Sequence, residues 1–396
     1  MTYDAAPDPR HKHRSLMGSA LAAAMVMAVG MVMAVGMGFA RFAYTGVYPV
    51  MVSEGLLTVH DGTLAASANY AGYLLGALLA SRLLTHQAHR WVIVSMVMSV
   101  VCLVYIAFAP SPLMIIVTRG IAGVFSALSM IAASLWLLQH KGYQQGAPIL
   151  FAGVGVGIFV SSELITLVQS QDIASFGLWI ALGLGSAVIA ALALSKLDNT
   201  QVLVETDLNN DTQNHHIPFG AWSLIAAYGL AGFGYIITAT YLPMLIGKSL
   251  GNVNPIHVWA IFGLGAAPSC YFWHKFHLHY GTHVALRVNL LTQAIGVVLP
   301  IVAPNAVGYI ASALIVGGTF MGTVTIAMPA AKRVSHTINF NLIAIMTAAY
   351  GIGQIVGPLL ASYLYAQSGT FTSSLIAAAL GLVFSAALTV RIPTTD

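Results

Sequence analysis

Apolar stretches of membrane-spanning length recur along the whole chain, separated by short segments that hold glycine, proline or charged residues. A helix that crosses the hydrocarbon core of a bilayer needs about 20 mostly apolar residues. Only 7% of the residues are charged, whereas a soluble domain carries about 25% because its surface faces water. The chain lacks the charge to cover a soluble globule, so we predict an all-α integral membrane protein.

Breaks at glycine, proline and charge predict twelve spanning helices, six in each half of the chain. The first six cover 17–52, 62–84, 90–109, 112–138, 147–169 and 174–195. The second six cover 220–247, 255–276, 283–303, 306–331, 336–366 and 371–391. The first apolar stretch is far longer than the apolar core of a signal peptide, about 7–15 residues, so we interpret it as a retained helix.

The positions of lysine and arginine predict the orientation of the helices, because these residues resist translocation in short loops. With both termini in the cytoplasm, twelve of the fifteen basic residues fall on the cytoplasmic side. Shifting the count by one helix would remove this asymmetry, so an even number of spans is supported independently of hydropathy. We therefore expect a multi-pass protein of the bacterial inner membrane with both termini cytoplasmic.

One polar stretch, from Ser195 to Pro218, is long enough to be a linker between two halves, and its acidic and amide residues suit a solvated connection. We predict a cytoplasmic segment at 1–16, a six-helix bundle at 17–195 and a cytoplasmic linker at 196–219. A second six-helix bundle at 220–391 and a cytoplasmic tail at 392–396 follow.

The two halves contain an internal repeat. Gly38 and Pro49 in the first helix have counterparts in Gly232 and Pro243 of the seventh, both at an offset of 194 residues. Parallel repeats of this kind imply two bundles related by an axis along the membrane normal. Such bundles can rock around a site at their interface, so we expect a central site between the halves.

These features together resemble the major facilitator superfamily (MFS). Arg119 and Gly123 in the fourth helix resemble the family's Arg-x-x-x-Gly motif there. The stretch 76–90 resembles its basic loop motif, although the usual loop aspartate is missing, and the run 36–49 resembles a bacterial subgroup of efflux-type members. The resemblance implies the MFS fold, with two pseudo-symmetric six-helix bundles that move around a central cavity.

Three ionisable residues, Arg41, Arg119 and Glu163, lie well inside predicted helices at similar depth in the outer part of the first half. A charge at the bilayer centre costs at least about 2.5–3.5 kcal/mol, so it normally faces a partner or a wet cavity. Our first hypothesis is that Glu163 pairs with Arg119 and exchanges a proton when the arginine moves or a substrate displaces it. The alternative is a structural ion pair between helices four and five.

Our second hypothesis is that Arg41 anchors an anionic group of the substrate, because its planar fork of five donors suits a carboxylate or phosphate. The alternative is that Arg41 snorkels or binds backbone carbonyls. Polar and aromatic residues on the helices around it are further candidate ligands, with packing as the alternative role for each. These candidates are Tyr44, Tyr48, Asn69, Tyr70, Tyr235, Thr238, Tyr241 and Gln354. A wider set with the same chemistry comprises Tyr73, Trp136, Thr240, Asn289, Gln293 and Tyr350.

Four histidines crowd the predicted loop after helix eight, at His274, His277, His279 and His283. Their spacing fits no metal motif, so we expect a cytoplasmic basic loop. The two cysteines, Cys102 and Cys270, sit in apolar runs and are interpreted as small buried hydrophobic residues. We predict no metal and no cofactor.

We predict a secondary active transporter that works by alternating access, and we favour proton-coupled export of a small organic anion or zwitterion. The direction of transport and coupling to sodium stay open. Efflux of apolar or cationic drugs is the second interpretation, in which the buried arginines are structural. A non-transporting membrane receptor or sensor is the third.

An enzyme is not expected, because the sequence has no nucleotide-binding loop, no metal-ligand motif and no Ser-His-Asp set at a credible depth. The expected partners are a small solute, protons and the lipid bilayer, and no nucleic acid. We expect a monomer, since the Gly-x-x-x-Gly repeats serve close helix approach within the chain.

Overall fold

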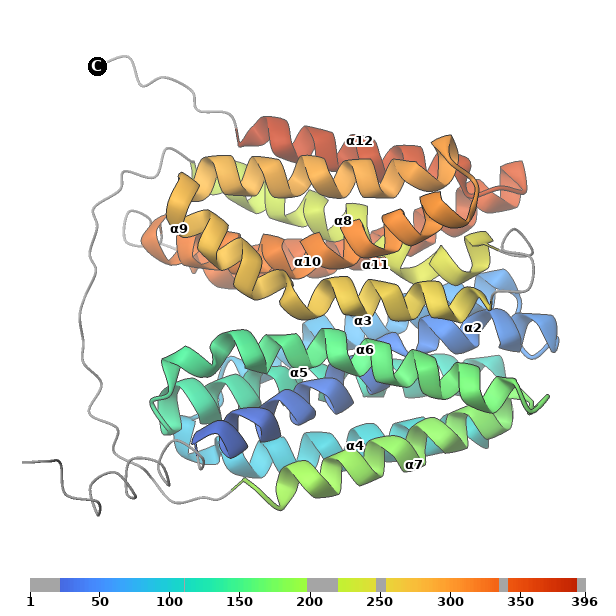
Figure 1. Cartoon of the computed structure of the whole chain (residues 1–396), viewed down its shortest axis with the longest axis horizontal. Helices are drawn as coiled ribbons and strands as arrows, with labels where there is room; N and C mark the ends of the chain where they lie inside the picture. Colours follow the sequence, from blue (N-terminus) through green and yellow to red (C-terminus); the bar gives the residue numbers. More distant parts are fainter. Residues whose placement is uncertain (1–21, 110, 198–219, 247–253, 335–340, 390–396) are drawn as a thin grey trace, which may run out of the picture.

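The computed structural model describes residues 22–109, 111–197, 220–246, 254–334 and 341–389, which form helices joined by short turns (Figure 1). Nine helical segments in this part of the chain are long and apolar enough to cross a membrane. One of them, Pro255–Val302, folds into two arms, and the helices Val59–Ala80 and Thr372–Leu388 complete the predicted twelve. The molecule is thus an all-helical, multi-pass membrane protein, as predicted.

The first half contains six spans. The first runs from Ala22 to Ser53 and includes the π-helix η1 (Ala34–Phe42) and the helix α2 (Tyr44–Ser53). The next are α3 (Val59–Ala80), α4 (Ala88–Ala107) and α5 (Pro112–Ser134), which continues as the π-helix η3 (Leu135–His140). The last two are α6 (Ala147–Gln169) and α7 (Ser175–Leu194). Helix α3 begins three residues before the predicted 62, because Thr58 and Asp61 form a capping box at its start.

The second half contains α8 (Ala221–Ile246), α9 (Pro255–Val302), α10 (Ala306–Val334), α11 (Leu342–Ser368) and α12 (Thr372–Leu388). The loop predicted between helices eight and nine, over residues 277–282, is wrong. The helix continues through His274, His277 and His279, and the chain reverses at Gly281, whose φ of 78° lies in the left-handed region that glycine adopts without steric cost.

The halves pack side by side, with η1 and α2 to α7 in one bundle and α8 to α12 in the other (Figure 1). Helices α6 and α9 form one seam between the bundles, and α3 and α11 form the opposite seam. A Cβ atom on Gly155 of α6 would lie 2.3 Å from the backbone nitrogen of Ala267 on α9, so only glycine allows this crossing. Small residues of this kind let transmembrane helices approach closely.

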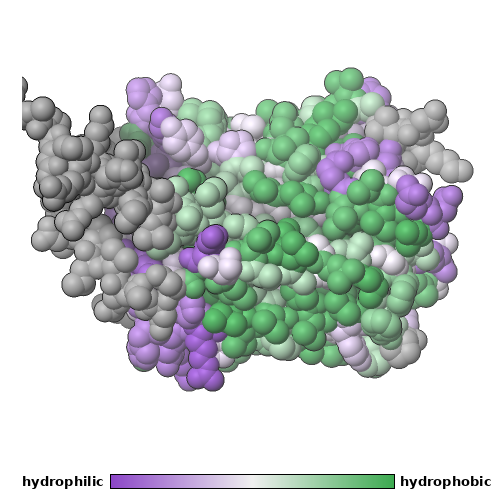
Figure 2. Space-filling view, turned by 60° about the horizontal axis from the view of Figure 1, so that its bottom comes forward, coloured by the Kyte–Doolittle hydropathy of each residue, from purple (hydrophilic) through white to green (hydrophobic). Residues whose placement is uncertain are grey.

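The outer surface supports the membrane assignment. Figure 2 shows apolar residues covering the middle of the molecule, with hydrophilic residues gathered toward its two ends. Many large apolar side chains are exposed, and those of Leu75, Leu184 and Leu380 are each more than half exposed. A soluble protein would not leave so extensive an apolar surface in water.

Some predicted segments lie outside the described residues. These are the terminal segments 1–16 and 392–396 and the linker from 198 onward. The described helices before the linker and those after it form the two groups that pack side by side.

Candidate substrate-binding site

A cavity of about 510 Å³ lies between the two halves. It begins beside Arg41 and extends to Ser81, Ser134 and Asn341, which mark the ends of α3 and α5 and the start of α11. That end of the bundle is the one predicted to face the cytoplasm. The cavity therefore forms a chamber that reaches from the middle of the molecule toward one side only.

Arg41 is the one charged residue among the described residues that line this cavity. Its side chain is buried, with 3% exposed. Arg41 Nη2 donates a hydrogen bond of 3.0 Å to Gln354 Oε1 on α11, and Gln354 Nε2 in turn donates to the hydroxyl of Tyr235 on α8. The guanidinium carbon lies 3.9 Å from the ring centre of Tyr73 on α3. Neutral groups of both halves thus hold the cation.

The charge of Arg41 has no counter-ion in the part of the chain that the structure describes. No carboxylate there forms an ion pair with it, and its Nε atom is buried without a hydrogen-bond partner. Taking a charge out of water is expensive unless a partner compensates it. A planar guanidinium with spare donors at the end of a cavity is suited to bind a carboxylate or phosphate.

Aromatic side chains form a stacked row beside Arg41. The ring of Tyr235 stacks on Phe320 at 5.3 Å and on Tyr350 at 5.8 Å. Tyr350 also stacks on Tyr228, with ring centres 4.5 Å apart. Such a row offers a surface for a planar or apolar group next to the cation.

Arg119 does not bind Glu163, so the predicted pair is wrong. Its Nη1 donates to the carbonyl oxygen of Ala40 at 2.7 Å and its Nη2 to that of Arg41 at 2.9 Å. These carbonyls lie at the end of the π-helix η1, where a change of helix type alters the regular hydrogen-bond ladder. Arg119 therefore holds the backbone that carries Arg41.

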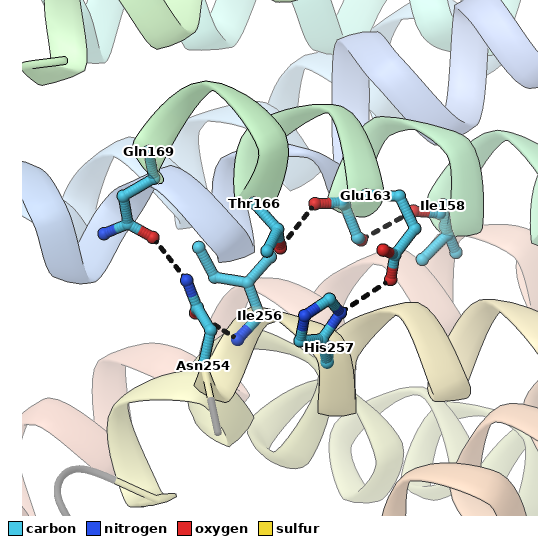
Figure 3. A network of polar contacts seen from close by, with 8 residues as sticks. Ile158, Glu163, Thr166, Gln169, Asn254, Ile256 and His257 are labelled. Carbon is cyan, nitrogen blue, oxygen red and sulfur yellow. Dashed lines mark hydrogen bonds and ion pairs between the residues drawn. The ribbon is translucent and has the colours of Figure 1, made fainter. Parts of the chain in front are cut away.

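Glu163 instead binds a histidine of the other half. Glu163 Oε1 lies 2.9 Å from Nδ1 of His257, and the two side chains are 39% and 43% exposed, respectively. Figure 3 shows the two side chains pointing toward each other from α6 and α9. Asn254 donates to Gln169 Oε1 at 2.7 Å one turn further out on the same seam. The acid thus joins the two bundles rather than two helices of one bundle.

His257 was not predicted, although the sequence carried a signal for it. It is the third residue of α9, and Glu163 lies about two turns before the end of the antiparallel α6. Both residues are therefore at similar depth near the outer ends of their helices. An ionisable residue within a membrane normally has a partner, so a histidine at matching depth was a candidate.

Most of the other predicted ligands do not line the cavity and lie on the far side of Arg41 from it, which is the side predicted to face outward. Thr45 Oγ1 donates to Ala239 O at 2.9 Å, and the hydroxyls of Tyr70 and Thr240 are 3.0 Å apart. These contacts cross between the halves and close the side predicted to face outward. The remaining ones are also engaged there, as Tyr44 donates to Gly62 O, Tyr48 to Val59 O, Asn69 to Arg119 O and Tyr241 to Pro358 O. Thr238 is fully buried, and its hydroxyl has no partner among the described residues.

Arg41, Tyr235 and Gln354 are thus the predicted ligands that the structure brings together at the cavity. Tyr73 and Tyr350 of the wider set also line it. Each lies near another predicted ligand on the same helix, since Tyr73 follows Tyr70 by three residues and Tyr350 precedes Gln354 by four. Residues at these spacings share a helix face. This pattern could have identified Tyr73 and Tyr350 as ligands of the same site.

The histidines of α9 form no metal site. His277 Nε2 and Arg333 Nη2 both lie 2.9 Å from the hydroxyl of Thr282, beside the turn at Gly281. Within the described ranges, no three His, Cys, Asp or Glu side chains are arranged to hold a metal ion. The two cysteines are buried and not bonded to each other.

Comparison with known proteins gives one family and one fold. Residues 33–390 match the family model MFS_4, described as "Uncharacterised MFS-type transporter YbfB". Among solved structures, the chain is similar to the nucleoside transporter NupG, with a TM-score of 0.66 and 14% sequence identity. That match covers 93% of this chain and 98% of the NupG chain. No curated protein matches the chain.

Proposed function

The chain belongs to the YbfB-like family of MFS-type transporters, and on this premise we propose that it exports a small organic anion from the cytoplasm, driven by protons. It is a membrane transporter rather than an enzyme. Export is part of the proposal, and the cavity gives the conformation in which it would begin. The cavity is open toward the end predicted to be cytoplasmic, so an exported solute would load in this conformation.

One observation carries the choice of an anion. Arg41 places a buried positive charge, without a counter-ion among the described residues, at the end of the cavity that lies in the middle of the molecule. A bound carboxylate would supply the missing counter-charge and accept hydrogen bonds from donors that are already desolvated. Hydrogen bonds between charged groups contribute about 1.5–3 kcal/mol, more than those between neutral groups. The stacked tyrosines beside it would hold the rest of a small molecule.

The pair of Glu163 and His257 supports coupling to protons. It joins α6 to α9 on the closed outer side, so it must break when the bundles separate there. A carboxylate and an imidazole exchange protons with water according to whether an opposite charge is near. The pair is therefore the candidate for coupling to protons. In this proposal His257 takes the place first assigned to Arg119.

Efflux of apolar or cationic drugs is the second candidate function. The observation that favours it is the presence of Met37, Met130, Met321 and Met328 in the cavity wall. Methionine is flexible and polarizable, so it adapts to ligands of different shape. In this alternative Arg41 has a structural role only.

A thermal-shift screen of the purified protein distinguishes the two functions. A ligand of the folded state at one hundred times its dissociation constant adds about 2.7 kcal/mol of stability. We expect organic anions to stabilise the wild type and Arg287→Ala, in which an arginine outside the cavity is removed, but not Arg41→Ala. Stabilisation of all three proteins by cationic or apolar drugs, and by no anion, would favour drug efflux.

A further inference from the structure

A second cavity adjoins the first. It has a volume of about 420 Å³ and lies between α6 of the first half and α9 and α10 of the second. The two cavities share four lining residues, Phe151, Met321, Val324 and Met328. We call this second cavity the side crevice. These four apolar side chains form a wall that the side crevice shares with the chamber beside Arg41.

The crossing of α6 and α9 explains why the side crevice exists. The two helices touch at Gly155 and Ala267, where a side-chain carbon would clash with backbone. From this contact they diverge toward the end predicted to be cytoplasmic, and the crevice fills the resulting gap. Gln144, Gln145 and His274 line it near that end, whereas Pro148 and Cys270 belong to its apolar interior.

We propose that the side crevice holds the apolar tail of a substrate whose anionic group binds Arg41, so that the substrate is an amphipathic organic anion. This inference rests on the proposed function and narrows its substrate class. The charged end of the substrate is inferred from Arg41, the cation in the central cavity. The position of the apolar tail is inferred from the wall that the two cavities share. Its methionine side chains have three rotatable bonds and can move aside for an adjacent group.

A second apolar space in the protein lacks this connection. A groove of about 430 Å³ lies between α4 and α5 and is lined by Cys102, Tyr105 and Val117, among others. None of its lining residues lines the central cavity. The groove therefore matches the side crevice in volume but offers no route to Arg41, and it serves as an internal control.

The two cysteines of the chain make the comparison measurable, because one lies in each space. In Cys102→Ser, the remaining thiol of Cys270 reports on the side crevice. In Cys270→Ser, the remaining thiol of Cys102 reports on the control groove. Both variants are labelled with a small methanethiosulfonate reagent in nanodiscs, with and without sodium decanoate or sodium butyrate.

Decanoate is expected to slow labelling of Cys270 at least fivefold and to leave labelling of Cys102 unchanged. Butyrate has the same carboxylate and a chain six carbons shorter, and it is expected to leave both unchanged. Equal effects of decanoate on both thiols, or an effect on neither, would overturn the proposal.

A chain-length series gives an independent test by calorimetry in nanodiscs. Each methylene that enters an apolar site raises affinity about fourfold, so affinity should climb from butyrate to decanoate in the wild type. Thr325 lines the crevice but not the central cavity. We expect Thr325→Trp to reduce the ratio of decanoate to butyrate affinity at least tenfold.

The outcomes separate this inference from the proposed function. Binding of butyrate and decanoate with equal, Arg41-dependent affinity would overturn the tail site and leave the anion transporter intact. An unchanged affinity ratio in a folded Thr325→Trp variant would do the same. Failure of every alkanoate to bind the wild type would overturn both.

Discussion

Thr45 donates a hydrogen bond of 2.9 Å to the carbonyl oxygen of Ala239, and the two residues are 194 positions apart in the chain. The same offset relates Gly38 to Gly232 and Pro49 to Pro243, so Thr45 and Ala239 are equivalent positions of the internal repeat. The pseudo-symmetry axis between the bundles therefore passes close to this contact. In the present conformation the halves touch at the axis on the side of Arg41 away from the cavity, and they part around the cavity itself.

This contact predicts that linking the two positions stops transport. Thr45→Cys with Ala239→Cys, in a background of Cys102→Ser and Cys270→Ser, is joined by a short thiol cross-linker and reconstituted into liposomes. The outer side then cannot open, so alternating access is blocked. We expect transport to fall to the background level after cross-linking and to recover after reduction. Full transport by the linked protein would contradict the assignment of this contact to a moving gate.

The hydrogen bonds of Arg119 predict that the protein loses stability when this side chain is removed. Arg119→Ala leaves the buried carbonyls of Ala40 and Arg41 without their donors, and each unsatisfied group costs about 1–3 kcal/mol. The expected destabilisation in thermal unfolding is therefore at least about 2 kcal/mol. Glu163→Gln is the comparison, because a half-exposed pair contributes about 0–1 kcal/mol. An Arg119→Ala protein as stable as wild type would refute the structural role.

The seam between Glu163 and His257 predicts a specific kinetic phenotype. In liposomes with a trapped pH dye, Glu163→Gln, His257→Gln and the double variant should each lose substrate-driven proton movement and retain exchange of substrate across the membrane. The double variant should be no worse than either single variant, because residues that act as one unit give non-additive effects. Unaltered proton movement in Glu163→Gln would remove the pair from the coupling mechanism.

The close approach of α6 and α9 predicts that one methyl group is not tolerated at Gly155. A Cβ atom there would lie 2.3 Å from Ala267 N, whereas at Gly120, which is also helical, the nearest atom would be 3.6 Å away. Gly155→Ala should therefore destabilise the protein by about 1–3 kcal/mol through overpacking. Gly120→Ala should be neutral or slightly stabilising, because alanine favours a helix. Equal melting temperatures of the two variants would show that the helices can move apart without cost.

Hydropathy and charge were sufficient to predict the helical fold. The described helices agree with the predicted spans within a few residues, and the predicted bounds at 17, 247, 336 and 391 lie outside the described residues. The histidine segment after helix eight was misplaced, because a helix that turns sharply at Gly281 has no polar loop to reveal it. Local sequence determines where a helix can form. The reversal of the chain between the two arms of α9 depends on a single glycine, Gly281.

The site was predicted only in part, for a geometric reason. Counting residues gives the depth of a side chain along its helix, and it placed Arg41, Arg119 and Glu163 at similar depth. It does not give the direction in which a side chain points around the helix. Glu163 and Arg119 share a depth but face different neighbours, so their predicted pairing failed. The side crevice depends on the angle between α6 and α9, which no residue spacing encodes.

The central claim is that Arg41 recognises the charge of the substrate, and comparison of benzoate with benzamide tests it most directly. The two ligands have nearly the same shape, and only benzoate is an anion. Their binding to wild type and Arg41→Gln is measured by calorimetry in nanodiscs at one pH and salt concentration. We predict that wild type binds benzoate at least tenfold more tightly than benzamide, a difference of about 1.4 kcal/mol, and that the preference vanishes in Arg41→Gln. The same preference in both proteins, or none in wild type, would contradict the account.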